Sequence, residues 1–138
     1  MLSVIITFSG LGAYGLLNDG RRISSTGSVV GVGVNVRLFW DPECTQEIDN
    51  INWGYLTPGD TIKKTIFIKN ISSSSKTISI NIEEWNPANL YQYFSFQLSC
   101  ENEVLEPGDV LMGDIILTIS QNIQNIYDFS FIIVIEGN

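Results

Sequence analysis

Apolar and polar residues alternate along several runs of this chain, and a period of two is the pattern of a half-buried β-strand. The longest run covers residues 29–40, where every even-numbered position is apolar, from Val30 to Trp40. Residues 61–69 and 77–83 repeat the pattern with isoleucines on one face. We therefore predict a strand in each of the three runs.

A polar segment, residues 70–76, separates the second and third of these strands. It is too short for the helix that connects parallel strands, so the sequence predicts an antiparallel hairpin here.

Three further apolar runs follow, at residues 93–100, 111–120 and 127–135, and each has the length of a strand. Proline and glycine separate the runs, and two of the breaks share the pattern L-x-P-G-D, at residues 56–60 and 105–109. Short strands joined by turns, each with one apolar face, favour an antiparallel β-sandwich over a barrel or a parallel sheet. We predict an all-β, immunoglobulin-like sandwich of about seven to eight strands.

The amino-acid composition supports an all-β fold and argues against several classes of function. The 138 residues are enough for one domain with a sizeable core, and they include 20 Ile, 9 Val and 8 Thr but only 2 Ala. The net charge of −8 is a poor match to nucleic acid. The chain has no histidine and no recognisable nucleophile or phosphate-loop motif, so we expect neither an enzyme nor a cofactor nor a small-molecule substrate.

The first seventeen residues are uncharged and largely apolar, and they have three interpretations. A transmembrane helix needs roughly 20 apolar residues, and three glycines weaken this one. A secretory signal would explain the small-x-small triplet at residues 13–15, but the basic residues that should precede the apolar run are missing. A β-strand would place Leu2, Val4, Ile6 and Phe8 on one face, either in the domain's own sheet or in a groove of a neighbouring subunit.

The two cysteines, Cys44 and Cys100, suit one disulfide, with two buried free thiols as the alternative. A metal site is not expected, because two cysteines without histidine supply too few soft ligands. Asn70 begins the only N-x-[ST] sequon, in the expected hairpin loop, so it is the glycosylation candidate.

Several polar and aromatic residues can be interpreted either as purely structural or as functional. The acidic residues Asp41, Glu43, Glu47 and Asp49 lack the spacing of a calcium loop, so a solvated loop is the better interpretation. Glu83 and Glu84 are adjacent in a strand and so point to opposite faces, which argues against a pair of catalytic carboxylates. The aromatic residues fit core packing better than a sugar platform, and only two of them have the position of a surface contact. These two are Tyr91 and Tyr93, whereas the tryptophans are Trp40, Trp53 and Trp85.

Five motifs, in order along residues 24–138, resemble a group of secreted archaeal immunoglobulin-like proteins. They are residues 25–34 (STGSVVGVGV), 39–45 (FWDPECT), 51–59 (INWGYLTPG), 85–87 (WNP) and 129–131 (FSF). Such domains are similar to the subunits of archaeal threads and bundling pili, and more distantly to the biofilm fibre protein TasA and camelysin. The resemblance implies an extracellular, cell-surface filament that assembles by donor-strand complementation, in which one subunit's N-terminal strand completes the sandwich of the next.

On this hypothesis residues 1–22 hold the donor strand and a linker, and residues 23–138 form the sandwich. The partner is another copy of the chain, in a head-to-tail polymer that can also contact other filaments or cell surfaces. The alternative is a monomeric or membrane-tethered surface domain that keeps the N-terminal strand in its own sheet and serves adhesion or carbohydrate binding.

Overall fold

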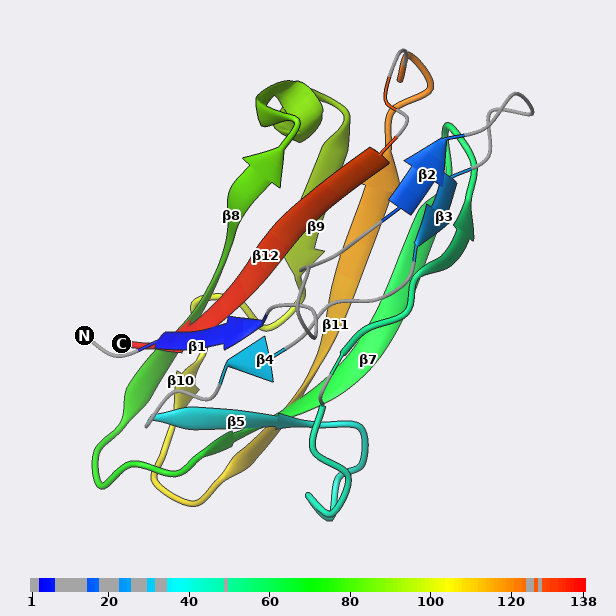
Figure 1. Ribbon diagram of the computed structural model, residues 1–138. Coiled ribbons are helices and arrows are strands. Elements are labelled where there is room, and N and C mark those ends of the chain that lie inside the picture. Colours follow the sequence, from blue (N-terminus) through cyan, green and yellow to red (C-terminus); the bar gives the residue numbers. More distant parts are fainter. Residues whose placement is uncertain are drawn as a thin grey trace.

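Two antiparallel β-sheets pack face to face in the computed structural model, which describes residues 3–6, 15–17, 23–25, 30–31, 35–48, 50–123, 126 and 128–138 (Figure 1). The first sheet has the strand order β10-β8-β12-β2-β3-β6, with β1 attached to β12 and β4 attached to β1. The second sheet has the order β5-β7-β11-β9. The predicted all-β antiparallel sandwich is confirmed. The strands are β1 (Ser3–Ile6), β2 (Gly15–Leu17), β3 (Ile23–Ser25), β4 (Val30–Gly31), β5 (Val36–Phe39), β6 (Gly54–Leu56), β7 (Thr61–Asn70), β8 (Lys76–Asn86), β9 (Phe94–Leu98), β10 (Val104–Leu105), β11 (Val110–Ile119) and β12 (Asp128–Gly137).

Helical structure in the described part of the chain is confined to a short 3-10 helix, η1 (Ala88–Gln92), between β8 and β9. No helix among these residues is long and apolar enough to cross a membrane.

The core lies between the two sheets and is built by alternate residues of the long strands. Ile66 and Ile68 of β7 and Ile115 and Leu117 of β11 are fully buried from one side, and Ile133 of β12 is fully buried from the other. Burying an isoleucine side chain contributes about 1.5 to 3 kcal/mol, so this alternation stabilises the packing of one sheet on the other. At one end the core is aromatic, with ring centroids 5.1 to 6.2 Å apart among Trp85, Phe94, Phe96, Phe129 and Phe131.

The predicted hairpin between residues 61–69 and 77–83 is wrong. Strand β7 pairs with β5 and β11 in one sheet, whereas β8 pairs with β10 and β12 in the other. The segment between them therefore crosses from sheet to sheet. A polar loop of this length can turn back within a sheet or span the roughly 10 Å between packed sheets, and its composition is the same in both cases.

The predicted continuous strand over residues 29–40 also differs from the structure. Its beginning forms β4, which pairs with β1 in the first sheet, and its end forms β5, which pairs with β7 in the second. The predicted inward parity holds in β5, where Val36 and Leu38 are buried. Alternation is equally suited to either sheet, so it does not reveal that the chain changes sheets between Gly31 and Val36.

The two L-x-P-G-D segments form the same turn. In each of them the N–H of the aspartate donates to the carbonyl oxygen three residues earlier, from Asp60 to Thr57 and from Asp109 to Glu106. The glycines have φ values of +90° at Gly59 and +82° at Gly108, a region that residues with a Cβ rarely adopt.

Candidate functional site: the strand slot beside β12

Two strands from the N-terminal part of the chain, β1 and β2, lie along one edge of β12. Strand β1 is antiparallel to β12, with Ser3 opposite Glu136 and Ile6 opposite Ile133. Strand β2 continues in the same direction, with Gly15 opposite Phe129. Together β1 and β2 cover most of the length of this edge, and β8 covers the other edge of β12.

The hydrogen-bonding pattern shows which groups of β12 depend on β1. Thr77 of β8 and Asn138 exchange two N–H···O bonds of 2.8 and 2.9 Å, which makes them a hydrogen-bonded pair. Since such pairs alternate along an antiparallel ladder, Glu136 and Val134 turn their backbone groups toward β8. Ile133 and Ile135 therefore turn theirs toward β1, and removing β1 would leave four backbone groups of β12 without a partner.

The opposite edge of β1 is also paired, so β1 fills an interior slot. Ile5 lies opposite Gly31 and Ile6 opposite Val30 of β4. Strand β2 likewise pairs with β3, and β3 with β6. Strand β1 thus lies between β12 and β4 within the first sheet, as Figure 1 shows.

In this single chain the slot is filled by the chain's own N-terminal strand. This is the arrangement of the alternative interpretation, in which the strand completes its own sheet. Of the four residues expected to form the donor face, Val4 and Ile6 lie within β1, whereas Leu2 and Phe8 lie outside the described residues. Because β1 and β2 pair with β12, the segment assigned to residues 1–22 shares a sheet with the predicted 23–138 domain.

The expected disulfide between Cys44 and Cys100 is absent, and both are free thiols. Cys44 lies in the loop after β5, and Cys100 lies in the turn after β9. Strands β7 and β11 stand between β5 and β9, so the two edge strands are three strand spacings apart, roughly 14 Å. A disulfide needs Cα atoms within about 7 Å of each other. Burial raises the pKa of Cys100 to about 11.

The expectation that Asn70 is an exposed glycan acceptor is also wrong, because its side chain is fully buried. Its Nδ2 donates to the carbonyl oxygens of Ser74 and Leu105, each over 2.8 Å. Its Oδ1 accepts from both the N–H and the hydroxyl of Ser72. The nitrogen that would carry a sugar is therefore held in the interior as a donor.

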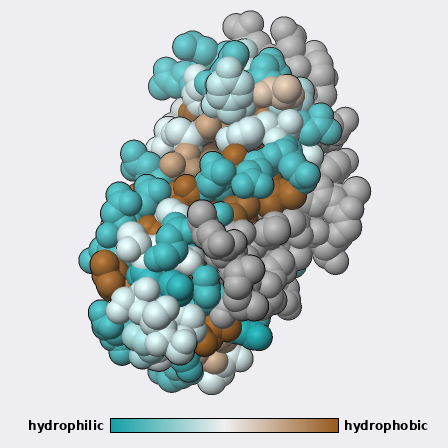
Figure 2. Space-filling model, turned by 90° about the vertical axis from the view of Figure 1, so that its left-hand side faces the viewer, coloured by the Kyte–Doolittle hydropathy of each residue, from teal (hydrophilic) through white to brown (hydrophobic). Residues whose placement is uncertain are grey.

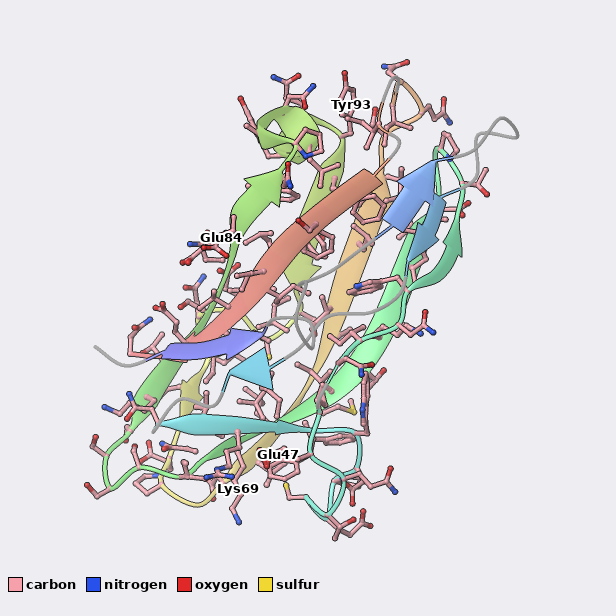
Figure 3. All side chains as sticks on the ribbon, in the orientation of Figure 1. Glu47, Lys69, Glu84 and Tyr93 are labelled. Atoms are coloured by element: carbon pink, nitrogen blue, oxygen red, sulfur yellow. The ribbon has the colours of Figure 1, made fainter. Side chains whose placement is uncertain are left out.

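The acidic loop after β5 is held by its own first carboxylate. Asp41 accepts from the backbone N–H groups of Thr45 and Gln46 and from the Thr45 hydroxyl. Glu47 forms a 3.3 Å ion pair with Arg37, and Figure 3 shows Glu47 next to β5 with Lys69 nearby. Asp49 lies outside the described residues. Within the described ranges no group of three or more acidic or cysteine residues is placed to hold a metal ion.

The tryptophans contribute to packing, as expected. Trp53 is 3% exposed and makes an edge contact with Phe96, and its Nε1 has no hydrogen-bond partner among the described residues. Trp40 and Trp85 are partly buried against the core. Tyr91 of η1 is exposed, whereas Tyr93 is half-buried at the same end of the molecule (Figure 3).

The sequence did not reveal an open side between the two sheets, where β8 and β9 lie. Four partly buried apolar residues and Asn81 line a hollow of about 260 Å³ there, and they are Ile80, Ile82, Trp85 and Phe96. A bulge at Glu84, with φ of +53°, shifts the register of β8 on β12. The one sequence signal was the adjacent pair Glu83 and Glu84, which breaks the alternation of β8.

Comparison with known proteins adds no further constraint on the site. A scan against models of protein families, a search of curated proteins and a search of solved structures each gave no match.

Proposed function

We propose that the chain is a structural subunit of an extracellular filament, in which β1 of one copy occupies the slot beside β12 of the next. The observation that carries the proposal is that β1 fills an interior position of a sheet, between β12 and β4. If β1 left this slot, an identical strand from a neighbouring copy could take its place.

Strand exchange would conserve the contacts seen within the chain. Ile133 and Ile135 would find the same backbone partners in a neighbour's β1, so the energy of the ladder would not change. Whether the slot holds the chain's own β1 or a neighbour's β1 then depends on protein concentration. The chain's own β1 has an effective concentration in the millimolar range, because a short linker joins it to the slot. Exchange is favoured only where copies are crowded to a similar concentration. Because one copy gives its strand to a second and receives one from a third, the assembly need not close.

A second candidate function is a monomeric or membrane-tethered surface domain for adhesion or carbohydrate binding. The pairing of β1 with β12 of the same chain favours it. In this case the slot is permanently filled, and the exposed loops, including Tyr91, carry the contacts. Neither candidate assigns a catalytic role to any residue.

Electron microscopy of the concentrated protein is the first test of the filament. We expect fibres when the protein is refolded at about 1 mM, because at this concentration β1 of a neighbouring copy can compete with the chain's own β1 for the slot. Ile6→Asp places a charge in β1 and should abolish the fibres. The surface-domain candidate expects no fibres from the unaltered chain at any concentration.

A cross-linking test then identifies the chain that fills the slot. Ser3 and Glu136 are register partners in a non-hydrogen-bonded pair, where side chains approach closely. In a background with Cys44→Ser and Cys100→Ala, one chain carries Ser3→Cys and a second carries Glu136→Cys. Mixing, refolding and oxidising the two should yield covalent dimers if strands are exchanged. A chain that carries both cysteines and closes only on itself, while the mixture stays monomeric, would falsify strand exchange.

A further inference from the structure

The outer edge of β8 is largely free of strand partners in the described structure. Strand β10 pairs with β8 only at Lys76 and Thr77, and residues 102 and 103 then bond to Ile78. Beyond that point the only hydrogen bond that a described residue makes to this edge is a weak one, 3.4 Å long, from the Ile80 N–H to a carboxylate oxygen of Glu101. Thr77 bonds to the β12 side of β8, and the direction of the backbone groups alternates along the strand. The N–H and C=O of Ile82 therefore point away from β12, toward the free edge.

The free edge opens onto an apolar groove. Strand β9, the edge strand of the other sheet, pairs only with β11 among the described strands, so the two sheets are not closed against each other here. The floor of the hollow is Ile80, Ile82, Trp85 and Phe96, and the rings of Trp85 and Phe96 are 6.2 Å apart. Figure 2 faces this side of the molecule and shows hydrophobic surface at mid-height, bordered by hydrophilic residues.

Three acidic residues lie near the groove, two of them on β8 and one in the turn after β9, and none is in an ion pair with a described cation. Glu83, Glu84 and Glu101 are exposed, and Figure 3 shows Glu84 pointing away from the outer edge of β8. The only ion pair among the described residues joins Arg37 to Glu47, so none of these three carboxylates has a cationic partner there. The free backbone edge of β8 suits an extended strand, the apolar floor suits apolar side chains, and the nearby carboxylates suit a positively charged ligand.

We propose that the opening between β8 and β9 is a docking site for an extended, positively charged segment of a different protein, which adds to the edge of β8. Alternate apolar side chains of the segment enter the groove, and its lysines or arginines lie beside Glu83 and Glu84. The Ile82 N–H and C=O bond to its backbone, and its carbonyl replaces Glu101 at Ile80. Pairing of two copies of this chain through β8 is less favourable than pairing with a cationic segment, because it brings the glutamates of both copies to one edge. The site lies on the far side of β8 from β12, so it does not depend on the filament.

The probe for this proposal is a blocked ten-residue peptide of alternating lysine and valine. Two control peptides are an alternating glutamate and valine peptide and the lysine peptide with N-methyl groups on alternate backbone amides. We expect only the unmodified lysine peptide to bind and to slow hydrogen exchange of the Ile82 amide about tenfold or more. Its affinity should fall with added salt, because the carboxylates near the groove are exposed.

Two variants separate strand addition from simple attraction of charge. Ile82→Ala removes part of the apolar floor and should weaken peptide binding, whereas Ile82→Pro also removes the outward N–H but no bond to β12, so it should weaken binding about tenfold more than Ile82→Ala. Glu83→Gln combined with Glu84→Gln should weaken binding about fivefold. The proposal is overturned if millimolar lysine peptide does not bind, if Ile82→Pro binds like Ile82→Ala, or if the glutamate or N-methylated peptide binds equally well. The peptide controls need no altered protein, so a misfolded variant does not leave the question open.

Discussion

The side-chain amide of Asn70 donates a 2.8 Å hydrogen bond to the carbonyl oxygen of Leu105, 35 residues further along the chain. The same amide holds Ser74 in the loop after β7, and the backbone of Asn70 bonds to Gly108 and Asp109 in the turn before β11. One buried residue thus ties together the sheet-crossing loop, β10 and a Pro-Gly turn.

We predict that Asn70→Ala destabilises the fold by about 2 to 4 kcal/mol, because two carbonyl oxygens lose their donor and a buried side chain is deleted. Asn70→Asp should be at least as costly, since the carboxylate keeps the shape but donates nothing and is buried. Urea unfolding measures both through the midpoint at constant slope. Ser73→Ala in the same loop is the control, because this exposed residue makes no side-chain bond and should stay within about 0.5 kcal/mol.

Gly113 leaves room for the sulfur of Cys100. A Cβ on Gly113 would lie 2.5 Å from Sγ of Cys100, closer than two such atoms can approach. We predict that Gly113→Ala costs about 1 to 3 kcal/mol through overpacking between β11 and the turn after β9. Cys100→Ala removes the sulfur, so the double variant should be more stable than the sum of the two single changes predicts. Additive losses in this double-mutant cycle would show that the contact is not the cause.

The inward parity of the strands was predictable from the sequence, whereas the sheet to which each strand belongs was not. Val36, Ile66 and Ile68 lie inward where alternation placed them, because one apolar face per strand is enough to specify a side. The chain crosses from one sheet to the other at residues 70–76, and this crossing loop is held by the hydrogen bond from Asn70 to Leu105. The two residues are 35 positions apart in the sequence, so no local pattern contains their contact. The sequon at Asn70 was misleading because the same three residues form a local turn, with Oδ1 accepting from Ser72.

The candidate site shows the same limit. Apolar character at the N-terminus suggested a strand, and β1 is one. Its slot between β12 and β4 follows from register and topology, which local patterns do not contain. The Cys44 and Cys100 pairing failed for a related reason, since an even count of cysteines says nothing about the two strands that stand between them.

We predict that the two thiols differ in reactivity and remain unlinked in the native protein. Intact mass should be the same with and without reductant. A disulfide-free fold reacts with a thiol reagent first at Cys44, which is half-buried, and slowly at Cys100, which is 2% exposed. Burial raises the pKa of both thiols, so the reaction of Cys44 should still accelerate above pH 9. A mass difference of two hydrogens, or equal rates at both sites, would contradict this prediction.

The raised pKa of Cys100 also sets the sign of a pH effect on stability. An unfolded thiol loses its proton near pH 9, whereas the folded thiol keeps it to about 11. Between these values the native state binds more protons than the unfolded state, so stability falls as pH rises from about 9 to 11. The contribution is fully present below pH 9. Cys100→Ala should flatten this part of the stability profile measured by urea unfolding, and Cys44→Ala should have a smaller effect.

The opposite sign is expected at Asp41. The hydrogen bond from the Thr45 hydroxyl is the largest cause that lowers the pKa of this carboxyl, aided by the N–H groups of Gln46 and Thr45 and partly opposed by desolvation. A lowered pKa means that the native state releases its proton more readily, so the stabilising effect is present above pH 3.8 and is lost as the pH falls through the folded value. NMR titration of the Asp41 carboxyl measures the shift. Thr45→Ala should raise the pKa toward its ordinary value and Thr45→Ser should preserve it, whereas an unchanged titration in Thr45→Ala would assign the shift to the backbone donors instead.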